Sequence, residues 1–201
     1  MIKLYKYQSF QSFENFYANS YLQDKVHFSN WNELNDPLEG YFRHNYYQEL
    51  TGIIDQKNHI KILSLADNYQ NMVMWAHYGS IHRGICLEYT IDDVNLNLDE
   101  NFSLQRIQYQ DDFPSVNNDK DFKENAISIL SHKLSPWNYE KETRILYFGD
   151  EALVNNKSIK LTRVILGALA GEHNLLKFIR IYKAFQRDFL GEKKPLFLEE
   201  K

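Results

Sequence analysis

The chain has 201 residues, of which 43% are apolar and 15% aromatic. This composition disfavours a disordered chain, and the length suffices for one core, so we expect one domain over residues 1–201. No apolar run approaches the ~20 residues of a membrane helix, and the first ten residues hold no signal-peptide core. The single cysteine excludes an internal disulfide. We therefore expect a cytoplasmic protein that binds no membrane.

Charge is distributed unevenly along the chain, although the net charge is only −4. Residues 92–125 hold nine acidic and three basic side chains, whereas residues 157–194 hold nine basic and three acidic ones. Two solvated surfaces of opposite sign explain this pattern without any ligand. The alternative is that the basic segment approaches a polyanion such as nucleic acid.

Hydrophobic periodicity predicts a mixture of strands and helices in the first half of the chain. In chain order, the elements are a strand at 2–7, a helix at 10–22, a strand at 25–29, a turn-rich segment at 30–40, a helix at 41–54, a strand at 60–66 and a helix at 71–79. The first strand alternates, so Lys3, Tyr5 and Tyr7 are expected on one side of it.

The second half of the chain continues the mixture. The predicted elements are strands at 84–89 and 103–109 around an acidic loop, a helix at 119–134, a charged strand within 135–149, a strand in 158–170 that enters a Gly/Ala turn, a helix at 172–189 and a last strand at 195–200. Strands and helices do not alternate strictly. We therefore predict an α+β domain with a mixed or antiparallel sheet and flanking helices.

The segment NMVMWAHYGSIHRGICLEY concentrates aromatic and imidazole groups. On a helical wheel its first apolar side chains cover nearly the whole circumference, so we expect this helix to be buried on most sides together with His77. A buried imidazole is usually neutral and hydrogen-bonded, which suits a structural role as well as a catalytic one. Tyr78, His82 and Arg83 lie within six residues of His77, and this concentration favours a site.

Several catalytic classes are disfavoured by the same segment. A zinc-binding histidine pair on a helix needs a four-residue spacing, whereas His77 and His82 are five apart, so no metal site is predicted. Ser80 lies outside the strand–turn–helix context of a hydrolase nucleophile. Cys86 lies in an apolar strand and is expected to be an inert, buried thiol. The chain also lacks a dinucleotide-binding glycine motif and a P-loop.

The turn LNDPLEG follows a predicted strand that carries Ser29. Asp36 before Pro37 favours a turn, and the Asn35 and Asp36 side chains can bond their own backbone. A structural loop explains these residues. Polar groups after a strand also lie at a sheet edge, which is a common place for ligand contacts.

The strand motif YEKETRILYF carries Glu140, Glu142 and Arg144 at alternate positions. Alternate residues lie on the same face about 6.6 Å apart, so the three groups are expected to form a ladder. An exposed edge with weak ion pairs is one explanation. We favour a cleft wall, because Leu146 and Phe148 continue the charged face into apolar surroundings.

Five motifs, in this order, resemble the bacterial DUF2971 family, which is named for an unknown function. They are LYKY, HFS leading into LNDPLEG, MWAHYGSIHRGICLEY, WNYEKETRI and RVILGALAG. The most specific is the W-x-H-Y-x-x-x-H-x-G-x-C run from Trp75 to Cys86. The resemblance covers most of the chain, from about Leu4 to the C-terminal helix, and it implies a family without implying an activity.

The element order and the charged strand are also similar to those of the ADP-ribosyltransferase fold. This resemblance implies NAD as the substrate and Glu142 as the catalytic glutamate, with Glu140 orienting the substrate and His77 on the nicotinamide side. The implied NAD contacts are Tyr5, Tyr7, Ser29, Trp75, Tyr78, His82 and Arg83. The chain departs from the pattern of that fold, since it has no His or Arg on the first strand and no S-T-S run on a middle strand.

Three functions follow from these motifs. The first is an ADP-ribosyltransferase that acts as a bacterial toxin or phage-defence effector, with RNA or DNA as the acceptor. The second is a metal-independent nuclease in which His77, His82 and Glu142 share acid and base roles. The third is a non-catalytic binding partner in a toxin–antitoxin type of system, with a cognate antitoxin protein. Both catalytic alternatives require His77 and Glu142 to meet across one pocket.

Overall fold

The computed structural model of the protein describes residues 1–18, 25–45, 50–189 and 197–199. The chain folds into two compact units. Unit 1 comprises residues 1–26, 66–92 and 155–201, and unit 2 comprises residues 27–65 and 93–154. Both units contain strands and helices, so the mixed α+β class is confirmed. One domain over residues 1–201 stays a prediction, because compactness alone does not show whether either unit folds by itself.

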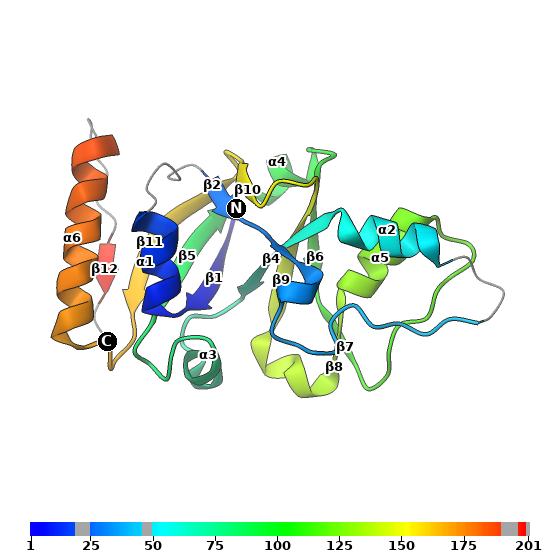
Figure 1. Ribbon diagram of the computed structural model, residues 1–201, viewed down its shortest axis with the longest axis horizontal. Coiled ribbons are helices and arrows are strands. Elements are labelled where there is room, and N and C mark those ends of the chain that lie inside the picture. Colours follow the sequence, from blue (N-terminus) through cyan, green and yellow to red (C-terminus); the bar gives the residue numbers. More distant parts are fainter. Residues whose placement is uncertain (19–24, 46–49, 190–196, 200–201) are drawn as a thin grey trace. The chain divides into compact units, whose positions relative to one another are not determined.

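The sheet of unit 1 is built around β5 (Ile85–Ile91) (Figure 1). Both β1 (Ile2–Gln8) and β11 (Ile159–Leu166) pair antiparallel with β5, and β12 (Phe197–Glu199) pairs parallel with β11. Six of the seven residues of β5 are buried and Thr90 is half-buried, in keeping with the central position and the largely apolar sequence of this strand. The predicted strands over these residues are confirmed, and the ends of the predicted last strand lie outside the described residues.

The helices of unit 1 are α1 (Phe10–Ala18), α3 (Met72–His77) and α6 (Gly171–Phe189). α1 packs on α6 through Phe13 and Phe178, whose ring centroids are 5.8 Å apart. Asn71 is the N-cap of α3, and its side chain accepts hydrogen bonds from two backbone N–H groups of the first turn. The predicted helix over 10–22 is confirmed to residue 18. None of the helices in the described ranges combines the length and the apolar character needed to cross a membrane.

Unit 2 contains a sheet in the order β3, β4, β9, β6. These strands are β3 (Ser29–Asn30), β4 (Ile60–Ala66, of which 60–65 belong to unit 2), β9 (Glu142–Phe148) and β6 (Phe102–Arg106). The β3–β4 and β6–β9 pairs are antiparallel. A separate parallel pair is formed by β7 (Gln108–Gln110) and β8 (His132–Leu134). Two further short strands are β2 (Lys25–His27, of which 25–26 belong to unit 1) and β10 (Leu153–Asn155, of which 155 belongs to unit 1).

The helices of unit 2 are short. α2 (Thr51–Asn58) and α5 (Phe122–Leu130) pack side by side (Figure 1). α4 (Asp93–Asn97) packs near β6, and two 3₁₀ turns, η1 (Trp31–Glu33) and η2 (Ser135–Glu140), complete the unit.

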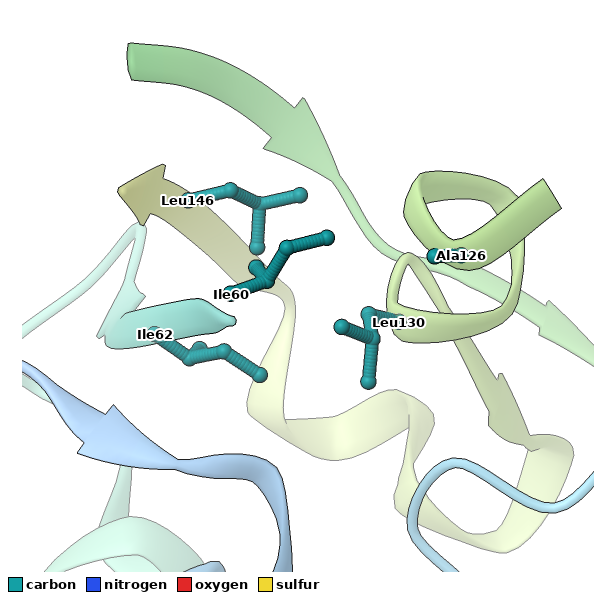
Figure 2. Close-up of a cluster of buried hydrophobic side chains, with 5 residues drawn as sticks. All are labelled: Ile60, Ile62, Ala126, Leu130 and Leu146. Carbon is teal, nitrogen blue, oxygen red and sulfur yellow. The ribbon is translucent and has the colours of Figure 1, made fainter. Parts of the chain in front are cut away.

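A buried hydrophobic cluster joins β4 and β9 to α5 (Figure 2). The side chains of Ile60, Ile62, Leu146 and Leu130 point toward one another, with Ala126 on the same helix as Leu130. Full burial of a side chain of the Leu or Ile type stabilises a fold by about 1.5–3 kcal/mol. The cluster therefore fixes α5 against β9, and it sets the position of the charged residues at the start of that strand.

Two predicted helices are wrong in part. Residues 41–45 are not helical, because the backbone of Arg43 bonds Pro114 and Val116 in an extended pairing, and α2 begins only at Thr51. Residues 46–49 of that prediction lie outside the described residues. The predicted helix over 119–134 ends at residue 130, where pairing with β7 makes a strand of 132–134. Tertiary pairing overrides local helix propensity in both places.

Two predicted strands are shorter than expected. The strand over 103–109 is interrupted at Ile107 and forms β6 and β7. The charged strand begins at Glu142, after a left-handed residue at Lys141 (φ 43°) that ends η2. Glu140 therefore lies in a 3₁₀ turn and not on the strand.

Candidate functional site

Five charged side chains of unit 2 form one buried group, the β9 cluster: Glu39, Lys133, Glu140, Glu142 and Arg144. They come from the turn 34–40, β8, η2 and β9. All five are buried, and Arg144 is 0% exposed. Because desolvating an isolated charge costs several kcal/mol, these groups are tolerated only through their mutual pairing.

Arg144 is the centre of the β9 cluster. Its Nε donates to Glu142 Oε1 at 2.7 Å, and its two terminal nitrogens donate to the Glu39 oxygens at 2.7 and 2.8 Å. It also donates to the carbonyl of Leu130 at 2.6 Å. The planar guanidinium thus binds two carboxylates at once. Burial by itself lowers the pKa of Arg144, but the charges of Glu142 and Glu39 outweigh it and raise that pKa.

Lys133 connects the two glutamates of the predicted ladder. Its Nζ donates to Glu140 Oε2 at 2.5 Å and lies 2.9 Å from Glu142 Oε2. The ammonium also lies 5.3 Å from the centre of the Trp137 ring. Burial alone lowers the pKa of Lys133, but the neighbouring carboxylates, Glu142 first, raise it overall. Glu140 therefore joins the cluster through a lysine and not through alternation on a strand.

Glu142 is held as a carboxylate. Burial by itself raises its pKa, but the charges of Arg144 and Lys133 and the hydrogen bonds from Arg144 outweigh burial, so the pKa lies well below its usual range. The prediction that Glu142 and Arg144 share a strand face is confirmed by their ion pair. The explanation as an exposed edge is wrong, because residues 142–146 are all buried. At Leu146 the same face belongs to the hydrophobic core and not to a cleft wall.

The turn that carries Glu39 is fixed by its own backbone contacts and by Lys57. The Asp36 carboxylate accepts the N–H of Leu38 at 2.9 Å, as the turn motif predicts. Lys57 of α2 donates to the carbonyl of Gly40 at 2.5 Å. Gly40 has φ +70°, and a Cβ there would lie 2.9 Å from the Lys57 Nζ, so the position requires glycine. The turn therefore has a second role, which is to hold Glu39 against the central arginine.

Lys57 itself is a buried cation that the sequence did not single out. Its Nζ lies 4.1 Å from the centre of the Trp31 ring and 5.2 Å from that of Phe42. Burial lowers the pKa of Lys57, and the charge of Glu39 opposes this effect. Sequence analysis also missed Glu39 and Lys133. The available signal was weak: a glutamate inside a turn motif and a lysine at the end of an apolar, helix-like run.

Unit 1 contains a second carboxylate site, the β5 cluster: Lys3, Tyr5, Glu88, Thr162 and Arg163. Glu88 accepts hydrogen bonds from Arg163 at 2.7 Å, Thr162 at 3.2 Å and Tyr5 at 3.3 Å, and its Oε1 lies 3.0 Å from the Lys3 ammonium. Burial raises the pKa of Glu88, but Lys3, Arg163 and Thr162 outweigh it and lower that pKa. No motif pointed to Glu88, because its partners lie on two other strands, β1 and β11, that are far from it in the sequence.

Three of the predicted NAD contacts are core residues of unit 1. Tyr7 donates its hydroxyl to the Asn68 carbonyl at 2.7 Å, and its ring packs edge-on against Trp75 with centroids 5.1 Å apart. The Trp75 indole donates to the Tyr69 carbonyl at 2.8 Å. Tyr5 is bonded to Glu88. Their hydroxyl and indole groups thus already have partners inside the unit, and NAD binding by these residues stays a prediction.

The expectation that α3 is buried on most sides is wrong. Only Met74 and Trp75 are buried, whereas Met72, Val73 and His77 are exposed. A helix of six residues rests on its sheet along one side only, so the remaining apolar side chains face outward. The expectation of a buried histidine at position 77 is therefore wrong. Cys86 is fully buried as predicted, and burial raises the pKa of its thiol.

A strained turn follows α3. Ser80, Ile81 and His82 have φ values of 50°, 53° and 62°, which L-residues rarely adopt, and a β-branched isoleucine least of all. The turn is held by backbone hydrogen bonds, including Leu169 N–H to the His82 carbonyl at 2.8 Å. It places the His82 ring parallel to Trp75, with centroids 6.0 Å apart. Arg83 follows as an exposed residue.

The predicted site residues are divided between the two units. Unit 1 brings Tyr7, Trp75 and His82 together, and unit 2 brings Glu140 and Glu142 together through Lys133. Ser29 is half-buried and pairs with Ile62 of β4. Because His77 and Glu142 belong to different units, their convergence on one pocket stays a prediction. Within the described ranges, no three His, Cys, Asp or Glu side chains are grouped to hold a metal ion.

The fold and these sites define a mixed α+β protein with a carboxylate–cation cluster in each unit. The family model described as "Protein of unknown function (DUF2971)" matches residues 74–145, from α3 to β9. The resemblance seen in the sequence is thus confirmed for this segment, which contains both the MWAHYGSIHRGICLEY and the WNYEKETRI motifs. No curated protein and no solved structure matches the chain.

Proposed function

We propose that the chain is an NAD-dependent ADP-ribosyltransferase with an ADP-ribosyltransferase-like fold, in which Glu142 is the catalytic carboxylate. It acts as a bacterial toxin or phage-defence effector, and RNA or DNA is the acceptor. The observation that carries the proposal is the fixed negative charge at the first residue of β9. Arg144 and Lys133 hold the pKa of Glu142 well below its usual range, so the group is anionic at physiological pH.

The proposed reaction requires a carboxylate of this kind. When the nicotinamide–ribose bond breaks, the bonding electron pair leaves with nicotinamide, and the ribose develops an oxocarbenium-like positive charge. A nucleophilic oxygen or nitrogen of the acceptor then forms the new bond at the same carbon and loses its proton to solvent. A preorganised anion stabilises the developing cation without reorganising at the moment of reaction. Glu140, which shares Lys133 with Glu142, is the substrate-orienting neighbour.

Access to Glu142 is restricted, because its side chain is only 5% exposed. Arg144 is completely buried and bonded to two carboxylates, so it cannot give way. Lys133 is the partner that a substrate displaces, since an ammonium on a flexible stem is easier to move than a guanidinium bonded on both sides. In this proposal Arg144 keeps the Glu142 carboxylate in place, and Lys133 covers that carboxylate until a substrate displaces the ammonium group.

A specific observation favours a second candidate, the non-catalytic partner of a toxin–antitoxin type of system. Both oxygens of Glu142 already contact cations of the same unit. The β9 cluster therefore stabilises unit 2 as it stands, and a binding protein needs nothing more from it.

The test is nicotinamide release from NAD by the purified chain, in the presence of RNA, DNA or protein acceptors. Glu142→Asp keeps the charge but withdraws the carboxylate by one methylene, so we expect a rate loss of about 100-fold or more. Glu39→Asp is the matched control, because it makes the same change on the other side of Arg144. We expect it to lower the rate much less at an equal folded fraction.

Each other outcome contradicts the proposal in a different way. Equal rate losses in the two variants show that Glu142 acts only by supporting the fold. Cleavage of nucleic acid without NAD selects the nuclease that uses His77, His82 and Glu142. Stable complex formation without any turnover selects the non-catalytic partner.

A further inference from the structure

A β-bulge in β11 brings an unusual set of hydrogen-bond donors to one face of the unit 1 sheet. Leu161 pairs with Tyr89 and Arg163 with Glu88, so Thr162 is an extra residue between them. A bulge re-aims neighbouring side chains and is often found next to functional sites. Here it brings the Thr162 hydroxyl and the Arg163 guanidinium onto the same carboxylate, at 3.2 and 2.7 Å.

The row next to the bulge carries two lysines. Lys3 of β1 and Lys160 of β11 both pair with Thr90 of β5, so all three side chains lie on one face of the sheet. Lys160 is exposed, and the Lys3 side chain is 62% exposed. The Thr90 and Thr162 hydroxyl oxygens are 3.2 Å apart. Two ammonium groups therefore flank a pair of hydroxyls on an accessible surface.

Positive charges are in excess on this face. Lys3, Lys160 and Arg163 carry three of them, whereas Glu88 supplies one negative charge from below the surface, where its side chain is 3% exposed, and the half-buried Asp92 supplies another at the end of β5. Its carboxylate orients the guanidinium, which also lies 4.9 Å from the centre of the half-buried Tyr69 ring. The exposed Lys157 precedes this strand and adds a further cation to the same basic stretch of sequence.

We propose that this cationic face, formed by Lys3, Thr90, Lys160, Thr162 and Arg163, binds the phosphate backbone of single-stranded nucleic acid. Ammonium, guanidinium and hydroxyl groups are the usual donors to phosphate oxygens. The two lysines lie on strands on either side of β5, so their backbones are about 10 Å apart. Donors at that spacing suit successive phosphates of a polyanion better than a single phosphate group. Binding is independent of turnover, whereas its use as an acceptor site rests on the proposed transferase function.

The test is fluorescence anisotropy with labelled single-stranded RNA and DNA of about 12 nucleotides, measured over a range of salt concentrations. The variant Lys3→Gln/Lys160→Gln should bind at least tenfold more weakly at low salt. Its slope of log K against log[salt] should be smaller by about 1.4, because each single-strand phosphate contact contributes about 0.7. The control, Lys25→Gln/Lys120→Gln, makes the same charge change at two other exposed lysines and should bind like wild type.

The single variant Lys160→Gln distinguishes a direct loss of binding from a loss caused by reduced stability. It leaves the Lys3–Glu88 ion pair intact, and it should lower the salt slope by about 0.7 with no change in thermal unfolding. Absence of oligonucleotide binding by the wild-type chain at low salt overturns the proposal, as does an equal loss in the control. Loss of NAD binding with unchanged oligonucleotide binding also overturns it, and assigns the face to a dinucleotide. Oligonucleotide binding without NAD turnover overturns the proposed function alone.

Discussion

The β9 cluster of unit 2 and the β5 cluster of unit 1 both stabilise a buried carboxylate with two cations, but they differ in how far the lysine is exposed to solvent. Each holds a glutamate between an arginine and a lysine: Glu142 between Arg144 and Lys133, and Glu88 between Arg163 and Lys3. In the β9 cluster the lysine side chain is 6% exposed, and in the β5 cluster it is 62% exposed. The first cluster is therefore closed, whereas the second presents a cation to solvent.

This difference changes what the charges contribute. In a closed, low-dielectric cluster, removal of one partner leaves an uncompensated buried charge, so the members depend strongly on one another. In the open cluster water and salt replace a lost partner at little cost. We therefore expect the β9 cluster to govern the stability of unit 2, and the β5 cluster to be free to exchange its lysine contact for a ligand.

Arg144→Met should have the largest effect. It leaves the carboxylates of Glu39 and Glu142 without their shared guanidinium, and breaking a buried pair in this way costs about 3–5 kcal/mol of unfolding free energy. Urea unfolding measures the loss. The matched control, Arg163→Met in the β5 cluster, should cost less than half as much. Equal losses in the two variants would contradict the contrast between the clusters.

Lowering the pH should reveal the same contrast between the β9 cluster and the β5 cluster. The pKa of Glu142 is lowered in the folded state, whereas a glutamate in the unfolded chain titrates near 4.3. Its stabilisation is therefore complete above that value and is lost as the pH falls toward the folded pKa. Unfolding free energies measured from pH 7 to pH 3 should fall steeply below about pH 5. Glu142→Gln should flatten this dependence more than Glu88→Gln, and the reverse order would contradict the assignment.

Glu88→Gln should have a smaller effect that depends on salt. It removes a charged acceptor from Arg163 and Lys3, which we expect to cost about 1–2 kcal/mol at low salt. Because Lys3 is exposed, 1 M salt should shrink this loss by screening the pair, whereas the loss in Glu142→Gln should be nearly unchanged. Denaturant titrations at two salt concentrations make the comparison. A salt-independent loss at Glu88 would show that the β5 cluster is closed after all.

Arg43→Ala should have the smallest effect. Arg43 pairs with Asp112 on the surface of unit 2, where both side chains are more than half exposed. Exposed pairs contribute about 0–1 kcal/mol, so the unfolding free energy should change by less than about 0.5 kcal/mol. A larger change, measured by the same urea titration, would mean that the backbone pairing of this segment depends on the ion pair.

The local pattern of the sequence was sufficient for several elements and for one part of the site. β1, β4, β5 and α3 lie where the periodicity of apolar residues predicted strands and a helix. The shared face of Glu142 and Arg144 also follows from the sequence alone, because side chains on a strand alternate with a period of two. These are properties of neighbouring residues, and they do not depend on what packs against the strand.

Only the tertiary structure decided which residues contact that face of β9 and whether it is buried. Glu39 and Lys133 reach Arg144 and Glu142 from a distant turn and from a strand that local propensity assigned to a helix, so no short motif contains the cluster. The exposure of His77 and the burial of Glu142 likewise depend on which segment covers each surface: α3 rests on its sheet by two side chains, and α5 closes over β9. Burial is a property of contacts between residues far apart in the chain, and a linear pattern does not carry that information.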